Sequence, residues 1–317
     1  MISRYLSPVK GHDRPPSIER GGIGDILREL MAQIDFVPYP PTSFPFRDLL
    51  VLEQLPLGPM DTVCEIGVGS GGTTARLAKI CASVTGFEIS HQTIARLRYL
   101  EQRFSNLRFV VGDITLREDV RAFEGSFTRV IACDTLEHVK EPGAFFSGIY
   151  KLLAPGGEFL VTFPNEPESK MHGITRFDDP RSLESLVTGA GLVQCRIGNA
   201  VLSDGANRVA DTLGWGPLKI ARKVLRRDRS KMKEVGVNAP QTFDQTHFMK
   251  KMTSYRKIAP IMNLYWYGVL KAMSARGPAF RIDWDFHVAP FIDCQVFVTG
   301  KKPLPAHANA NEMEAAA

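Results

Sequence analysis

A glycine-rich string at residues 64–72, Cys-Glu-Ile-Gly-Val-Gly-Ser-Gly-Gly, constrains the fold of this 317-residue chain more than any other feature. It follows an apolar run at residues 62–66 and precedes a helical pattern at residues 73–81, so it lies at a strand-to-helix junction. Glycines there let the backbone turn tightly and pass close to a ligand, while the start of the helix offers free N–H groups. The string therefore predicts a site for a nucleotide-like cofactor.

A helix is expected from about residue 47, and strand and helix signals alternate after it. Strands are expected at residues 62–66, 83–88, 107–112, 129–133, 158–163, 192–197 and 294–299, and helices at 73–81, 93–104, 144–153 and 183–190. Apolar strands that alternate with helices predict an α/β fold, a Rossmann-like doubly wound sheet that is buried on both faces. With 44% hydrophobic and 23% charged residues, the chain has enough apolar material for such a core.

Two stretches of the chain lack this alternation of strands and helices. Residues 1–45 contain seven of the 21 prolines and predict an extended arm. Nearly a hundred residues separate the last two expected strands, too many for a plain loop, so this stretch must have structure of its own. We expect four parts: an N-terminal arm (1–45), the cofactor-binding domain (46–201 and 291–303), a mainly helical insertion (202–290) and a disordered tail (304–317).

The glycine string alone does not choose between cofactors, because Gly67, Gly69 and Gly72 also satisfy the GxGxxG pattern of dinucleotide sites. Glu65 argues against a dinucleotide, since a carboxylate beside the first glycine would repel a pyrophosphate. It suits a cationic cofactor instead. Glu88 ends the next expected strand, where a carboxylate can accept from both hydroxyls of a ribose, and Asp113 ends the third. Asp113 is placed to accept from an exocyclic adenine amine, with Ile114 against the ring.

These residues resemble a known family. The string at residues 65–71, Glu88, the Gly112-Asp113 pair, residues 133–139 (Cys-Asp-Thr-Leu-Glu-His-Val) and the segment at 152–165 look like the class I S-adenosylmethionine-dependent methyltransferases. The pattern is most similar to the small-molecule branch that includes ubiquinone-biosynthesis O-methyltransferases. The resemblance covers about residues 47–200 and 291–302. It implies a seven-stranded sheet with an antiparallel last strand, whose final hairpin would be formed by residues 192–197 and 294–299.

The resemblance also implies an enzyme that uses S-adenosylmethionine and releases S-adenosylhomocysteine. It places the methionine part of the cofactor against Glu65, Gly67 and Gly69, the ribose on Glu88 and the sulfonium beside the backbone of residues 133–134. The full set of expected cofactor-binding residues is Glu65, Gly67, Val68, Gly69, Gly71, Glu88, Ile89, Gly112, Asp113, Ile114, Cys133 and Asp134.

Methyl transfer from a sulfonium is an in-line displacement that requires alignment and little acid–base chemistry. His138, just after the fourth expected strand of the domain, is the nearest candidate for a general base. A structural role, in which it caps a helix or holds the Asp134 loop, is the alternative. The sequence has no CxxC pair, and we expect no metal.

The insertion at 202–290 differs from the rest of the chain. It holds 16 lysines and arginines against 7 acidic residues, a net charge of +9, and all three tryptophans. Because binding sites combine aromatic walls with a few charges, we expect a substrate-binding cap with Trp215, His247, Tyr265 and Trp266 as contacts. The alternative is a helical subdomain with its own aromatic core and a solvated basic face. Apolar stretches at 209–225 and 258–273 also permit contact with a membrane surface.

The function that these sequence features favour is O-methylation of a small apolar or anionic acceptor. Nucleic acid is disfavoured, because residues 134–137 read Asp-Thr-Leu-Glu where base-amine methyltransferases usually carry an Asn/Asp-Pro-Pro-aromatic signature. The alternatives are a peripheral membrane protein that handles lipids, a methyltransferase of a lipid-linked acceptor, an RNA-binding methyltransferase and an NAD-dependent oxidoreductase. Because the sequence has no signal peptide and no spanning run, and its odd number of cysteines fits a reducing compartment, we expect a cytoplasmic protein.

Overall fold

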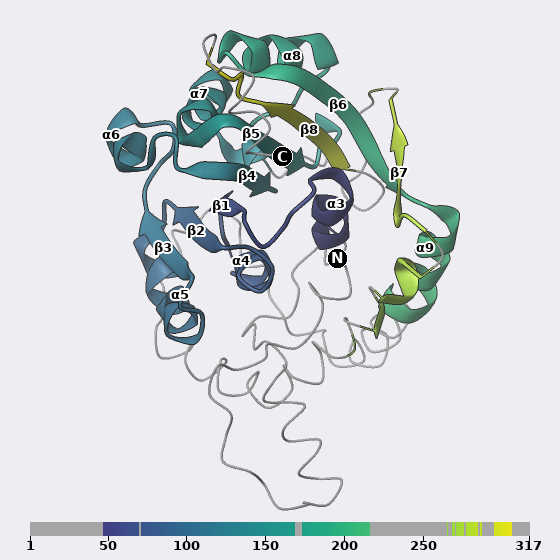
Figure 1. The fold of residues 1–317 in the computed structure, drawn as a ribbon. Helices are drawn as coiled ribbons and strands as arrows, with labels where there is room; N and C mark the ends of the chain where they lie inside the picture. Colours follow the sequence, from purple (N-terminus) through teal and green to yellow (C-terminus); the bar gives the residue numbers. More distant parts are fainter. Residues whose placement is uncertain are drawn as a thin grey trace, which may run out of the picture.

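Eight strands form one mixed sheet in the part of the chain that the computed structural model describes (Figure 1). That part comprises residues 47–69, 71–168, 173–215, 265, 268–269, 271–275, 277–284, 286 and 295–305. The strands are β1 (Thr62–Ile66), β2 (Ser83–Glu88), β3 (Leu107–Val111), β4 (Phe127–Cys133), β5 (Leu153–Phe163), β6 (Val193–Leu202), β7 (Phe280–Asp283) and β8 (Gln295–Lys301). The α-helices are α3 (Arg47–Gln54), α4 (Gly72–Leu77), α5 (His91–Arg103), α6 (Arg117–Val120), α7 (Pro142–Leu152), α8 (Pro180–Gly189) and α9 (Asp204–Val209).

The sheet has the strand order β3-β2-β1-β4-β5-β8-β6-β7. Neighbouring strands from β3 to β5 are parallel, whereas β8 runs antiparallel to both β5 and β6. This topology confirms the Rossmann-like fold and the antiparallel last strand. The expected final hairpin is present as well, since Ile197 in β6 lies opposite Val298 in β8.

One strand was not expected, and it comes from the insertion. Strand β7 pairs antiparallel with the end of β6, where Leu202 lies opposite Phe280 and Asn199 opposite Asp283. The sheet therefore has an eighth strand, at its edge. In α3, the carboxylate of Glu53 accepts hydrogen bonds from the backbone N–H groups of Ala279 (2.6 Å) and Phe280 (3.1 Å). The insertion thus joins the main fold at this end, and the chain division at residues 201 and 291 remains a prediction.

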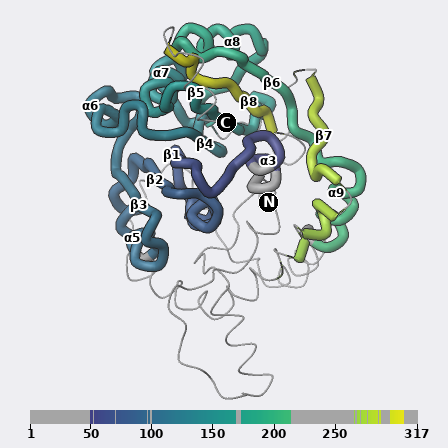
Figure 2. Tube along the Cα trace, in the orientation of Figure 1, coloured from purple at the N-terminus to yellow at the C-terminus, as the bar shows by residue number. Residues whose placement is uncertain are grey.

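Helices lie on both faces of the sheet (Figure 2). Each face has its own hydrophobic core of buried side chains. On one face, α3, α4, α5 and α9 contribute buried side chains such as Leu50, Leu77, Leu97 and Ala206. On the other face, α6, α7 and α8 pack against the sheet with a phenylalanine-rich core that includes Phe146. Burial on both faces explains why the parallel strands read as continuous apolar runs.

The ends of several elements follow from local chemistry. Ser90 begins α5 with a side chain that accepts from the N–H of Thr93, and Asp179 begins α8 in the same way with Pro180 in its first turn. Strand β5 starts five residues earlier than expected. Leu153 pairs with Phe127 across a register shift, so a residue expected at the end of a helix begins a strand.

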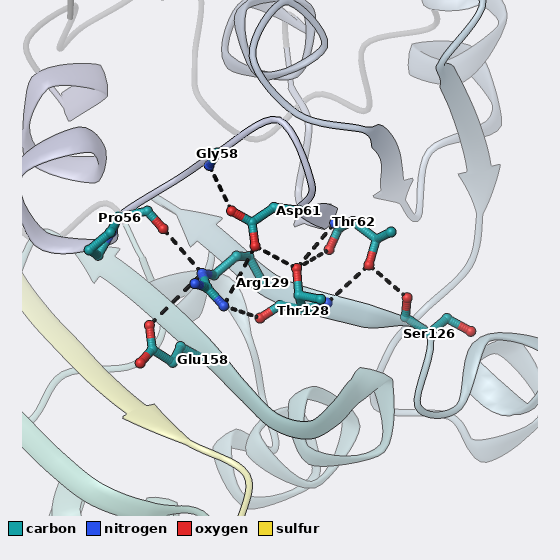
Figure 3. A network of polar contacts seen from close by, with 8 residues as sticks. All are labelled: Pro56, Gly58, Asp61, Thr62, Ser126, Thr128, Arg129 and Glu158. Carbon is teal, nitrogen blue, oxygen red and sulfur yellow. Dashed lines mark hydrogen bonds and ion pairs between the residues drawn. The ribbon is translucent and has the colours of Figure 1, made fainter. Parts of the chain in front are cut away.

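A network of polar side chains fixes the edge of the sheet where β1 and β4 begin (Figure 3). Asp61 accepts from the N–H of Gly58 (2.7 Å) and from the hydroxyl of Thr128 (2.8 Å), and its carboxylate lies 3.6 Å from Arg129 Nη1. Thr62 and Thr128 exchange backbone-to-hydroxyl hydrogen bonds of 3.1 Å in both directions. These contacts leave the opposite edge, where the parallel strands end, for the glycine string and its neighbours.

None of the helices within the described ranges is both long and apolar enough to cross a lipid bilayer.

Candidate active site

The glycine string forms a turn that only glycine tolerates well. Gly67, Gly69 and Gly71 have φ angles of 74°, 51° and 73°, which lie in the left-handed region. Gly67 also lies directly against Thr135, so that an added Cβ would collide with Thr135 Oγ1. At Gly69 the nearest atom to an added Cβ would be the Gly67 carbonyl oxygen at 4.0 Å, so this part of the turn is open to a ligand.

The three expected carboxylates lie at one edge of the sheet. Strands β1, β2 and β3 are adjacent and parallel, so their last residues meet there. Glu65 is almost fully buried, with 2% of its surface exposed. Glu88 is half-buried and accepts from the N–H groups of Ser90 (3.1 Å) and Gly69 (3.4 Å). It therefore connects the end of β2 to the glycine turn.

Asp113 follows β3 and is held in place by two contacts. Its Oδ1 accepts from the backbone N–H (2.9 Å) and the hydroxyl (2.7 Å) of Thr115, and its own N–H donates to Asp119 Oδ2 at 2.7 Å. Gly112, before it, passes close to Asp119, whose Cβ would lie 3.3 Å from an added Cβ. The carboxylate is thereby fixed at the same edge as Glu88.

Apolar side chains near these carboxylates divide into buried and exposed ones. Val68 and Ile114 belong to the two cores, with 2% and 4% of their surfaces exposed. By contrast, Ile89 is 70% exposed and Leu116 is 46% exposed. Sequence reasoning missed Leu116, although an apolar residue three positions after Asp113 is a readable signal. These two exposed side chains are available to an apolar ring, whereas the side chain of Ile114 packs in the core.

The turn after β4 closes the site on its other side. Asp134 has a φ of 51°, and its N–H donates to the carbonyl of Thr162 at 2.9 Å. Thr135 Oγ1 donates to the carbonyl of Ile66 (3.2 Å) or of Cys133 (3.1 Å). The ends of β1, β4 and β5 are therefore joined. The side chain of Cys133 is buried with 4% of its surface exposed.

Gln295 contacts this turn, and sequence reasoning missed it. Its Nε2 donates to Asp134 Oδ1 at 2.7 Å, across 161 residues of sequence. Gln295 is completely buried at the start of β8. A single glutamine in an apolar run carries no pattern that would have pointed to this role.

His138 lies in a short 3₁₀ helix, Leu136–His138, directly after the turn. The side chain is 53% exposed, and Nε2 lies 3.8 Å from Oε1 of Glu137, which is buried. The carbonyl of Glu137 accepts from the N–H groups of Ile174 (2.7 Å) and Thr175 (3.0 Å). The backbone here is therefore well fixed, while the imidazole of His138 is accessible.

The expected substrate contacts in the insertion are only partly described. Tyr265 is half-buried and packs against the core on the α3 face. Trp215 ends a π-helix, Ala210–Trp215, and its side chain lies outside the description, as do His247 and Trp266. These positions do not distinguish a substrate-binding cap from a helical subdomain with its own aromatic core.

Few of the described side chains near this edge could support nucleophilic or metal-dependent chemistry. Burial raises the pKa of the Cys64 thiol well above its usual range, and the neighbouring Glu65 carboxylate raises it further, so this thiol stays protonated. In the described part of the chain, no group of three or more His, Cys, Asp or Glu side chains could hold a metal ion.

Part of the chain is similar in sequence to a known protein family and to several known proteins. Residues 64–161, which run from β1 into β5, match the family model described as "Methyltransferase domain". A ubiquinone biosynthesis O-methyltransferase of Pseudomonas paraeruginosa is 30% identical over 114 residues, which is 36% of this chain and 49% of that protein. Phosphoethanolamine N-methyltransferase 2 of Caenorhabditis elegans is 33% identical over 108 residues, or 33% of this chain and 24% of that protein.

One solved structure with a similar backbone is phosphoethanolamine N-methyltransferase 2 of Haemonchus contortus, in complex with phosphomonomethylethanolamine and S-adenosylhomocysteine. It has a TM-score of 0.49 and 17% sequence identity, and the match covers 88% of this chain and 57% of that one. The chain spans about half the length of the first of these curated relatives and about a quarter of the second.

Proposed function

We propose that this chain, whose residues 64–161 form a class I S-adenosylmethionine-dependent methyltransferase domain, methylates a small apolar or anionic acceptor on oxygen. One observation carries the proposal. The glycine turn, in a left-handed backbone conformation, lies beside carboxylates that follow one another along the ends of β1, β2 and β3. A cationic nucleoside with a free ribose diol matches that arrangement of charge and hydrogen-bond acceptors.

The described residues fit this cofactor. Gly69 leaves room at the turn, and buried Glu65 supplies negative charge near a positively charged sulfonium and ammonium. Glu88, which is half-buried at the end of β2, would accept from the ribose hydroxyls. Asp113 would accept from the adenine amine, with Ile89 against the ring. When bound, S-adenosylmethionine supplies a methyl group on a cationic leaving group.

The chain itself then has to align the acceptor and to manage one proton. The turn at Cys133 and Asp134, joined to β1 and β5, provides a fixed wall for alignment. His138 is our proposed general base, because its exposed imidazole directly follows this turn. A hydroxyl acceptor would lose its proton to that imidazole during transfer.

The acceptor side is assigned to the insertion at 202–290. Its positive net charge favours an anionic acceptor, and Trp215, His247, Tyr265 and Trp266 are its proposed contacts. The similarity to ubiquinone biosynthesis O-methyltransferases supports oxygen as the methylated atom. The similarity to a phosphoethanolamine N-methyltransferase keeps nitrogen as the second candidate.

A transfer assay with tritiated methyl groups tests the proposal. The purified chain is incubated with labelled S-adenosylmethionine and, separately, with protocatechuate, a prenylated catechol, phosphoethanolamine and a short RNA. We expect label in a catechol. Label in phosphoethanolamine alone would move the methylated atom to nitrogen, and label in RNA alone would overturn the small-molecule assignment.

A further inference from the structure

Gln295 presents an unused hydrogen-bond acceptor inside the protein. Its Nε2 donates to Asp134 Oδ1 at 2.7 Å, and because a carboxylate only accepts, this contact fixes which end of the amide is the nitrogen. The carbonyl oxygen Oε1 therefore points elsewhere. It is buried and has no hydrogen-bond partner among the described residues. A buried acceptor without a donor lowers stability, so such an atom indicates a partner that arrives from outside.

The position of this pair along the sheet indicates the kind of partner. In the order β3-β2-β1-β4-β5-β8, the expected cofactor carboxylates lie on β1, β2 and β3, on one side of β4. Asp134 follows β4 itself, and Gln295 begins β8, two strands further on the other side. If the cofactor occupies the β1–β3 side, the methyl group is transferred toward the Gln295 side.

Strand pairing places a second polar atom on the same face. Cys133 lies opposite Thr162, and Thr162 lies opposite Phe297, so these side chains share a face of the sheet. Gln295 is two residues before Phe297 and points to that face as well. Thr162 Oγ1 is also buried without a hydrogen-bond partner within the described ranges. This face carries α9 and Tyr265, which belong to the insertion.

The Asp134 turn gives the pair its rigidity. A non-glycine residue with a φ of 51° is held in a conformation that costs energy. Two contacts hold it there, the backbone hydrogen bond to Thr162 and the side-chain hydrogen bond from Gln295. Gln295 comes five residues after the stretch assigned to the insertion, at the start of β8, and its side chain contacts the turn after β4.

We propose that Gln295 and Asp134 form a hydrogen-bonding subsite for the methyl acceptor, in which Oε1 of Gln295 accepts from a hydroxyl or ammonium group and Gln295 holds Asp134 in position. This inference rests on the proposed function, because it assumes that the acceptor lies on this side of β4. The subsite selects acceptors that carry a donor beside the atom to be methylated. It disfavours acceptors whose corresponding group is already fully methylated.

Calorimetry on the S-adenosylhomocysteine complex tests the subsite without any turnover. Two matched pairs of probes differ only in their donors. Protocatechuate carries two hydroxyls and veratrate is its dimethyl ether, while phosphoethanolamine carries a primary ammonium with N–H donors and the quaternary ammonium of phosphocholine has no N–H donor. Wild type should bind a donor-bearing probe more tightly than its methylated counterpart. Gln295→Leu should abolish that preference, weakening the donor-bearing probe about tenfold, with S-adenosylhomocysteine affinity unchanged within about twofold.

Two further variants test whether Asp134 and Gln295 bind the acceptor together or only pack against each other. Asp134→Asn keeps an acceptor oxygen and tolerance of a positive φ but removes the charge, so it should weaken phosphoethanolamine more than protocatechuate. In an Asp134→Ala background the amide of Gln295 loses the acceptor that orients it, so Gln295→Leu should then weaken the donor-bearing probe by less than it does in the wild-type background.

The subsite is overturned if wild type shows no preference within either probe pair, or if Gln295→Leu retains the preference. If Gln295→Leu also loses affinity for S-adenosylhomocysteine, Asp134→Asn takes its place as the test. The subsite is then overturned if Asp134→Asn retains the wild-type preference within the probe pairs. Probe preference without methyl transfer would overturn the proposed function and leave the subsite standing.

Discussion

The carboxylate of Glu88 accepts a hydrogen bond from the backbone N–H of Gly69, at 3.4 Å, and thereby joins the end of β2 to the turn after β1. The same carboxylate accepts from the N–H of Ser90, at 3.1 Å. A group held by two backbone donors is fixed in position before a ligand arrives. The proposed cofactor site is therefore built from local contacts at one edge of the sheet.

The turn at Gly67 should be sensitive to a single methyl group. Gly67→Ala places a Cβ against Thr135 in a left-handed conformation, and we expect the free energy of unfolding to fall by about 1–3 kcal/mol. Gly205→Ala is the control, since Gly205 lies in α9 with open space around it, and that change should be neutral or slightly stabilising. Urea denaturation followed by circular dichroism measures both. Equal stabilities of the two variants would contradict the close packing of the turn.

His138 should matter for turnover and little for cofactor affinity. If its half-exposed imidazole takes the acceptor's proton, His138→Gln lowers turnover by about 10²–10⁴-fold, because general-base help is of that size. Calorimetry with S-adenosylhomocysteine should show unchanged affinity. A variant that keeps wild-type turnover at every pH would make His138 structural.

Lys79 should give the protein's stability a pH dependence in the alkaline range. Burial, with the nearby charge of Arg103, lowers the pKa of Lys79 to about 7 in the folded protein from 10.5. Between these values the unfolded chain binds more protons than the folded one, so the free energy of unfolding gains a contribution that rises with pH. Lys79→Met should remove that rise. Denaturation curves of both proteins from neutral to alkaline pH measure the difference, and parallel profiles would contradict the shift.

The insertion and the cofactor site should be separable. Because β7, Val269 and Met273 belong to the sheet and core, a deletion has to spare them. Replacing residues 216–264 with a short linker should leave S-adenosylmethionine affinity within about 1 kcal/mol, since sites without shared partners are nearly additive. Methyl transfer to the acceptor identified by the tritium assay should be lost. Retained transfer would show that this stretch does not recognise the acceptor.

Sequence reasoning located the sheet and placed the three expected carboxylates at one edge of it, because both depend on local patterns. Strand β2 was predicted with its observed bounds, because a strand-like run ends there at Glu88. The edge strand β7 was missed because four residues with mixed polarity carry little signal. Pairing with β6 and the hydrogen bonds from its backbone to Glu53 stabilise it, and both are distant in sequence. Gln295 was missed for the same reason.

Calorimetric titration of the wild-type chain and of Glu88→Ala with S-adenosylmethionine, and of the wild type with NAD, tests the central claim most directly. The wild type should bind S-adenosylmethionine and not NAD, because Glu65 repels a pyrophosphate. Glu88→Ala should lose about 1–3 kcal/mol of binding free energy, the scale for hydrogen bonds to a charged group. Binding of NAD, or unchanged affinity of Glu88→Ala for S-adenosylmethionine, would contradict the assignment of this edge as the methyl donor's site.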